Sequence, residues 1–287
     1  MVDLVRDPKA WQRRYAVGRG AGERVVLVPT MGYLHQGHVA LLREARRRAD
    51  EGGVRGLALA TIFVNPAQFG PNEDLARYPR DLEGDLARCA EAGVDAVLAP
   101  GGPDQVYTRD HETWVEVEQV SRGLCGARRP GHFRGVATVL TKLFNLTHPH
   151  VAVFGEKDFQ QLQVIRAMVR DLDFGIEIVG VPIVRDVDGL ALSSRNAYLS
   201  PDERRRARAV PRALADAQAR ASGGERDPAA LASHARRTLE EAGARVDYVE
   251  IVDPISLQPA ARAATGSRML VAAFFGATRL IDNVALP

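Results

Sequence analysis

Residues 25–38 read VVLVPTMGYLHQGH, a short apolar run that ends in proline and is followed by two glycines and two histidines. The apolar run, Val25–Pro29, has the length and composition of a strand buried on both faces. Residues 38–49 then place apolar side chains on one side and arginines on the other, which predicts an amphipathic helix. The stretch therefore predicts a strand, a loop and a helix, the unit from which parallel α/β sheets are built.

The same alternation continues through the first two-thirds of the chain. Apolar runs predict further strands at residues 57–64, 95–99, 151–154 and 176–184, and periodic patterns predict helices at 82–92, 136–146 and 159–172. Repeated units of this kind predict a Rossmann-like parallel sheet with helices on both faces. Trp114–Glu118 (WVEVE) alternates between apolar and acidic residues, which predicts an edge strand.

After Asp186 the pattern changes from alternating units to helices followed by strands. Capping signals predict helices from Ser200 to about Ala221 and from Asp227 to near Gly243. Strand-like runs then follow at residues 246–252, 269–275 and 279–284. We therefore expect two domains, a Rossmann-like catalytic domain at 1–185 and a smaller α+β domain at 186–287.

Composition narrows the class of protein. The 287 residues are 46% hydrophobic and 26% charged, and 38 basic residues against 36 acidic ones give a net charge of +2. That balance argues against a nucleic-acid-coating protein, and two cysteines are too few for a disulfide framework. The sequence has no apolar stretch near the ~20 residues of a membrane span and no N-terminal hydrophobic signal core. We expect a cytoplasmic protein that binds neither nucleic acid nor membrane.

The loop between the first strand and its helix carries the strongest chemical signal. Helix N-termini that follow parallel strands hold anionic ligands, because free N–H groups and the helix dipole converge there. Gly37 would let a phosphate approach the backbone, and His35 and His38 could donate hydrogen bonds to it as charge builds. Two alternatives stay open: the histidines only cap the helix, or they bind zinc, for which no third ligand lies at helical spacing.

Two further segments follow predicted strands and should lie at the same sheet edge. In NPAQFGPNED, residues 65–74, the amides of Asn65 and Gln68 suit recognition of hydroxyl and carboxylate groups, although an Asn-Pro turn is the simpler explanation. In GEKDFQQ, residues 155–161, Lys157 is one of only three lysines and fits a phosphate contact. Gln161 lies four residues later on the same helical face.

Near the predicted domain junction, Leu192–Asn196 (LSSRN) places two hydroxyls beside a guanidinium. That combination suits a triphosphate or pyrophosphate, and a helix-capping turn is the alternative. The basic, glycine-containing stretch Arg128–Gly135 is interpreted as a lid or as an entry wall of the site. The sequence contains no Gly-x-Ser-x-Gly elbow, Walker P-loop or G-x-G-x-x-G fingerprint, which disfavours acyl-serine, P-loop and NAD chemistry.

Taken together, these segments resemble the pantothenate synthetase (pantoate–β-alanine ligase) family of the H-x-G-H nucleotidyl-transfer superfamily, which also includes class I aminoacyl-tRNA synthetases. The resemblance runs in family order from PTMG at residue 29 to RN at residue 196. It includes NPAQFGPNEDLARYPRD, RPGHFRGVATVL, FGEKDFQQLQVI and LSSRNAYLS. Leu192 departs from the family, which usually has Met there; a similar-sized apolar residue should matter little.

The resemblance implies a two-step ligation that uses ATP with Mg²⁺. The pantoate carboxylate attacks the α-phosphate to give pantoyl adenylate and pyrophosphate, and the β-alanine amine then displaces AMP to give pantothenate. It also implies a homodimer formed through the N-terminal domain, with the C-terminal domain as a lid. The Mg²⁺ ligands and the general base for the amine are not identified.

Residue roles carried over from the family follow the matching positions. His38 is the proton donor, and His35, Lys157 and Arg195 supply further positive or donor character. Gln68 and Gln161 hold pantoate, Gln68 also lies near β-alanine, and Asn65 remains a substrate-binding candidate from its residue type. The residues expected to line ATP are Met31, Gly32, Tyr33, Leu34, His35, Gln36, Gly37, His38, Gly155, Glu156, Lys157, Asp158, Val184, Leu192, Ser193, Ser194 and Arg195.

Three competing functions remain. A nucleotidylyltransferase of the same superfamily would share H-x-G-H but leave the nucleotide on its product. A non-enzymatic nucleotide sensor would not need His38, Lys157 and the two glutamines together. A tRNA-binding synthetase is disfavoured by the near-neutral charge.

Overall fold

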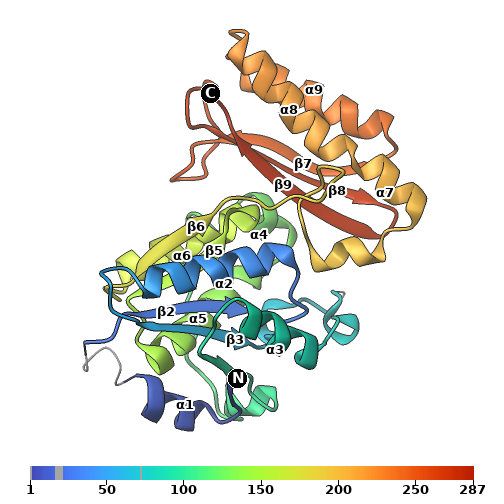
Figure 1. Cartoon of the computed structure of the whole chain (residues 1–287). Coiled ribbons are helices and arrows are strands. Elements are labelled where there is room, and N and C mark those ends of the chain that lie inside the picture. Colours follow the sequence, from blue (N-terminus) through green and yellow to red (C-terminus); the bar gives the residue numbers. More distant parts are fainter. Residues whose placement is uncertain (1, 17–21, 72) are drawn as a thin grey trace. The chain divides into compact units, whose positions relative to one another are not determined.

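The computed structural model describes residues 2–16, 22–71 and 73–287, so Asn72 of the NPAQFGPNED segment lies outside the described residues. The chain divides into two compact units (Figure 1). The first comprises Met1–Ser121, Cys125–Glu156 and Gln161–Pro182, and the second comprises Arg122–Leu124, Lys157–Gln160 and Ile183–Pro287.

The first unit contains a six-stranded sheet in which every pairing is parallel. Its strands, in spatial order, are β1 (Asp3–Val5), β4 (Ala96–Leu98), β3 (Leu57–Ile62), β2 (Val25–Thr30), β5 (Val151–Gly155) and β6 (Glu177–Val181). The helices are α1 (Pro8–Tyr15), α2 (Gln36–Ala49), α3 (Leu82–Glu91), α4 (Leu124–Arg128), α5 (His132–Thr147) and α6 (Phe159–Asp171). The predicted Rossmann-like parallel sheet is confirmed.

Burial on both faces explains why β2 is a continuous apolar run. Val25 and Leu27 belong to one core cluster, together with side chains of α1, α5 and α6. Val26 and Val28 point to the opposite face and join a second cluster with α2 and α3. Alternate side chains of a strand face opposite sides of the sheet, so a strand covered on both sides needs apolar residues throughout.

The strand order places a topological switch next to β2. From β2 the chain proceeds outward to β3 and β4 on one side, and β5 and β6 lie on the other. Parallel α/β sheets bind ligands at the carboxyl ends of their strands where the direction of winding reverses. The H-x-G-H loop follows β2, and Gly155-Glu156 ends β5 and follows it, so both lie at this switch.

The second unit packs three helices with an antiparallel sheet. Its sheet has the order β7 (Arg245–Val252), β8 (Arg268–Phe275) and β9 (Thr278–Ala285), and its helices are α7 (Pro201–Ala207), α8 (Ala209–Ser222) and α9 (Pro228–Glu241). The single helix predicted from Ser200 to Ala221 is instead broken at Arg208. Pro211 explains the break, because its ring has no N–H and collides with the carbonyl four residues earlier, that of Ala207.

The predicted edge strand at Trp114–Glu118 is wrong. The backbone there belongs to no strand, and the Val115 N–H donates to Thr138 Oγ1 of α5 at 3.0 Å. Val115 and Val117 pack against the core from outside the sheet. The alternation therefore reflects packing of an extended segment on a helix, which produces the same period of two as a strand.

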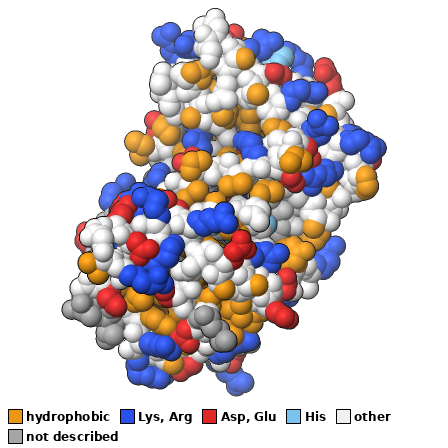
Figure 2. Space-filling model, viewed as in Figure 1, with side chains coloured by type: hydrophobic (Ala, Val, Ile, Leu, Met, Phe, Trp, Pro, Cys, Tyr) orange, Lys and Arg blue, Asp and Glu red, His pale blue; other side chains and the backbone are white. Residues whose placement is uncertain are grey.

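The arginine runs at 46–48 and 204–206 lie on helices, where such charges are commonly solvated, but Arg46 is largely buried. Only 14% of its side chain is exposed, and it is paired with Asp50 and, at 2.7 Å, with Asp95. Arg204 likewise contacts Asp186 at 2.6 Å. On the face seen in Figure 2, basic and acidic side chains are interspersed. Among the described residues, every helix is too short or too polar to span a bilayer.

Candidate active site

The two histidines of the H-x-G-H loop cap α2 through their Nδ1 atoms. His35 is the N-cap residue, and its Nδ1 accepts the Gly37 N–H at 3.1 Å. His38 Nδ1 accepts the His35 N–H at 3.2 Å, and the two rings lie 4.1 Å apart. An Nδ1 atom that accepts a hydrogen bond carries no proton, so each neutral ring has its proton on Nε2. Capping and phosphate donation are therefore compatible, because they use different nitrogens.

A buried carboxylate that the sequence analysis missed holds the turn before this cap. Asp85 of α3 is 1% exposed and accepts the Tyr33 N–H at 2.8 Å and the Leu34 N–H at 2.6 Å. Burial raises the pKa of Asp85, and these two donors oppose the rise. Gly32 has φ +82°, and a Cβ there would lie 2.9 Å from Asp85 Oδ2. Asp85 thus fixes the backbone of two residues expected to line ATP and packs closely against a third.

Asp85→Asn is expected to destabilise the fold by about 1–3 kcal/mol, since one amide oxygen replaces two carboxylate acceptors and leaves a buried N–H unpaired. Urea denaturation measures the loss. Glu83→Gln is the matched control, because it removes the same charge from a more accessible position on the same helix. Equal stability of the two variants would contradict the role of Asp85.

Asn65 and Gln68 form a buried amide pair after β3. Asn65 is the N-cap of a short 3₁₀ helix, η1 (Pro66–Gln68), and is 1% exposed. Its Nδ2 donates to Gln68 Oε1 and to the Gly135 carbonyl, both at 3.1 Å, and its Oδ1 accepts from Tyr107 Oη at 2.8 Å. Gln68 Nε2 in turn contacts Met31 Sδ at 3.1 Å. These bonds occupy Asn65 and aim Gln68 toward the loop that follows β2.

Within Arg128–Gly135, the stretch predicted to be a lid or entry wall, two side chains are held by polar contacts. Arg129 is 18% exposed and forms a bidentate ion pair with Glu73, and His132 is 7% exposed. Both side chains bond to the Gln68 carbonyl. Arg129 and His132 therefore hold the last residue of η1 through its carbonyl oxygen.

Three other predicted ligands of the first unit follow β5 at this edge of the sheet. Gly155 ends β5, which pairs directly with β2, and Glu156 follows it. Gln161 lies in the first turn of α6 and is half-buried. Three adjacent strands, β3, β2 and β5, thus deliver the first unit's candidates to one edge.

The remaining candidates belong to the second unit. Lys157 Nζ lies 3.6 Å from Asp158 Oδ2, and the Lys157 carbonyl accepts from Asn283 Nδ2 at 3.1 Å. Asn283, in β9 and 2% exposed, was not found from the sequence. The Leu192 N–H donates to the Val184 carbonyl at 3.0 Å, which brings these two distant positions together.

The LSSRN segment forms a capped turn. Ser193 Oγ accepts the Arg195 N–H at 3.3 Å and caps the 3₁₀ helix η5 (Ser194–Tyr198). The Asn196 side chain donates to the Ala191 carbonyl at 3.0 Å. The capping alternative is therefore real, and it leaves the phosphate role of Ser194 and Arg195 as a prediction.

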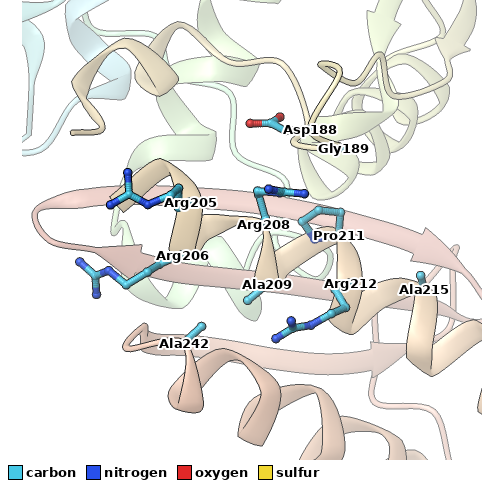
Figure 3. A pocket seen from close by; sticks show the side chains of 10 residues that line it. All are labelled: Asp188, Gly189, Arg205, Arg206, Arg208, Ala209, Pro211, Arg212, Ala215 and Ala242. Atoms are coloured by element: carbon cyan, nitrogen blue, oxygen red, sulfur yellow. The ribbon is translucent and has the colours of Figure 1, made fainter. Parts of the chain in front are cut away.

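The second unit also has a cavity of about 580 Å³ lined partly by Arg205, Arg206, Arg208 and Arg212. Arg205 and Arg206 already pair with Asp202. Figure 3 shows the guanidinium groups of Arg205 and Arg208 pointing in opposite directions. Because these groups do not converge on one centre, the cavity has no shared anion-binding geometry.

Within the described ranges, no group of three His, Cys, Asp or Glu side chains is arranged to hold a metal ion. Both cysteines, Cys89 and Cys125, are buried and unpaired with each other. The proposed catalytic residues offer imidazole, ammonium and guanidinium groups, which suit anions, and the residues expected to line ATP add two carboxylates, those of Glu156 and Asp158.

Comparison with known proteins identifies the family of this chain. The sequence model of the family described as Pantoate-beta-alanine ligase matches residues 3–285. The chain belongs to that family. This ligase is 70% identical over 285 residues to the pantothenate synthetase of Anaeromyxobacter dehalogenans, with 99% of each chain covered. It is 58% identical to that of Myxococcus xanthus, covering 100% of this chain and 96% of the relative.

Solved structures of family members share the fold of this ligase. Pantothenate synthetase from Thermus thermophilus superposes with a TM-score of 0.92 at 46% identity over the full length of both chains. The pantoate-beta-alanine ligase of Francisella tularensis, complexed with beta-gamma ATP and beta-alanine, gives 0.77 at 28% identity and covers 99% and 98% of the chains.

Proposed function

We propose that this ligase condenses pantoate with β-alanine to pantothenate, with cleavage of ATP to AMP and pyrophosphate through a pantoyl adenylate. The observation that carries the proposal is the pairing, at adjacent strand ends, of two Nε2-protonated histidines with the amide pair Asn65–Gln68. The histidines suit a phosphate and the amides suit a small hydroxy acid. ATP and β-alanine bind in the Francisella relative.

In the first step, a pantoate carboxylate oxygen attacks the α-phosphorus, and the bond to the bridging oxygen breaks to release pyrophosphate. His38 and His35 would donate from Nε2 to oxygens that gain charge in this step. Lys157 would neutralise phosphate charge through its compact ammonium. Arg195 would do so through its planar guanidinium, which can donate two parallel hydrogen bonds. The amide of Gln68, joined by that of Gln161, would orient pantoate without competing charge.

In the second step, the neutral β-alanine amine attacks the acyl carbon and AMP leaves with the former carboxylate oxygen. The amine loses its proton, and no residue is assigned as its base. Gln68 would lie beside the acyl group in both steps, which accounts for its firm placement by Asn65. The residues proposed to line ATP are those expected from the sequence: Met31–His38, Gly155–Asp158, Val184 and Leu192–Arg195.

Mg²⁺ is proposed to enter with ATP. The donor set described above makes no oxygen cage for a protein-held magnesium ion, and Mg²⁺ is commonly bound through substrate phosphates and water. We therefore assign it no protein ligand and no separate step.

Product analysis tests the proposal against the nucleotidylyltransferase alternative. With ATP, pantoate and β-alanine supplied together, pantothenate, AMP and pyrophosphate should appear in equal amounts. A nucleotidylyltransferase would release pyrophosphate while the nucleotide stayed on the product. Pyrophosphate without free AMP would therefore reject the ligase reaction.

Three organisational points are part of the proposal. The division into domains 1–185 and 186–287 is supported by the change of unit at Ile183. A homodimer through the first domain is supported by Trp114, a large apolar side chain that is 40% exposed. Trp114 lies in an extended segment that belongs to no strand. Sedimentation gives the mass that tests the homodimer. A cytoplasmic location is supported by Cys89 and Cys125, which are both buried and form no disulfide.

A further inference from the structure

The Gln68 carbonyl is held by a chain of partly buried and buried side chains to which the proposed reaction assigns no role. Glu73 Oε1 accepts from Arg129 Nε at 2.8 Å, and a second carboxylate–guanidinium bond of 2.5 Å makes the pair bidentate. Arg129 Nη1 lies 3.0 Å from His132 Nε2. His132 Nδ1 lies 2.8 Å from the Gln68 carbonyl oxygen. The chain therefore runs from Glu73 through Arg129 and His132 to the backbone of Gln68.

The direction of this chain is fixed by Arg129. A guanidinium has only donors and stays protonated in proteins, so His132 Nε2 must accept. The single proton of the neutral ring then sits on Nδ1, from which it donates to the Gln68 carbonyl. Because the residue is 7% exposed, water does not readily substitute for that donor.

Helix α5 packs closely against the backbone of residues 67 and 68, the segment whose carbonyl contacts His132. A Cβ added to Gly135 would lie 2.2 Å from the Ala67 carbonyl oxygen and 2.6 Å from the Gln68 nitrogen. The Gly135 carbonyl also accepts a hydrogen bond from Asn65 Nδ2. The side chain and the backbone of Gln68 are thus fixed separately, the first by Asn65 and the second by His132 at 2.8 Å, with a longer contact of 3.4 Å from Arg129 Nη2.

We infer that His132 is a positioning residue for the ligation: as an Nδ1–H donor oriented by Arg129, it sets where the Gln68 amide meets pantoate. It does not touch substrate. The inference rests on the proposed function, because it requires Gln68 to be a substrate ligand. Displacement of such a ligand by about 1 Å can cost on the order of 100-fold in rate.

Two nearly isosteric substitutions separate positioning from packing. His132→Asn keeps an N–H donor at the δ position. His132→Leu introduces a side chain of nearly the same shape as asparagine but without the donor. His132→Leu should raise the KM for pantoate about 10- to 100-fold and leave the KM for ATP within about twofold. His132→Asn should recover most of the loss. If the leucine variant lacks a cooperative urea transition, His132→Gln, whose amide lies one bond further out, replaces it.

A second measurement asks whether His132 acts only through Gln68. In a Gln68→Ala background, His132→Leu should cause no further change in the pantoate KM. Three results would each overturn the inference: a wild-type pantoate KM in folded His132→Leu, no difference between Asn and Leu, or full additivity with Gln68→Ala. Wild-type enzyme is assayed first, since absence of pantoate-dependent activity there would reject the proposed function instead.

Discussion

Replacing His38 by alanine is expected to lower kcat/KM on the order of 10²- to 10⁴-fold, because the proposed transition state loses a donor at the reacting phosphate. His38 Nε2 is the protonated nitrogen, while Nδ1 accepts the His35 N–H. The alanine variant also loses that capping bond and should be less stable by about 0.5–2 kcal/mol. Steady-state kinetics and urea denaturation measure the two effects.

His38→Asn separates the two effects. Its Oδ1 can replace Nδ1 as acceptor of the His35 N–H, so the cap and most of the stability should return. No group replaces the Nε2 donor, so the activity should stay low. Activity that recovered together with stability would mean that His38 only caps α2.

Lys157→Met is expected to lower kcat/KM on the order of 10²- to 10³-fold with little change in stability. The lysine ammonium pairs only loosely with Asp158, at 3.6 Å, and the aspartate side chain of that pair is 49% exposed. Such surface pairs contribute about 0–1 kcal/mol. The bond from Asn283 is to the Lys157 backbone, so it survives the substitution.

Lys9→Met is the matched control for Lys157. It removes the same ammonium from an exposed position on α1 that is not among the residues proposed to line ATP, so activity and stability should both stay close to those of the unsubstituted enzyme. Pyrophosphate release in single-turnover experiments reports the first step directly. Near-normal release by Lys157→Met would remove Lys157 from that step.

The fold of the first unit was largely predictable because the central strands of its sheet are buried on both faces. Runs such as Val25–Pro29 have few alternatives to a central parallel strand. β1, of three residues, and α1, of eight, escaped because so short a pattern carries no period. Their stability comes from distant partners instead: Trp11 Nε1 donates to Thr147 Oγ1, 136 residues away.

Site residues could be predicted where they directly follow a strand. They could not be predicted where they are held by contacts with residues far away in the sequence. His35, His38 and Gln68 could be singled out because each lies just beyond an apolar run. Asp85 reaches the loop across 51 or 52 residues, and Asn283 reaches Lys157 across 126, with no local signal in either case. Such contacts are set by packing of separate elements, which one sequence does not specify.

Pyrophosphate–ATP exchange tests the central claim most directly. With pantoate present and β-alanine absent, labelled pyrophosphate should enter ATP, and the exchange should stop when pantoate is omitted. That result requires a reversible acyl adenylate. Absence of exchange in folded protein that binds Mg-ATP would contradict the two-step ligation.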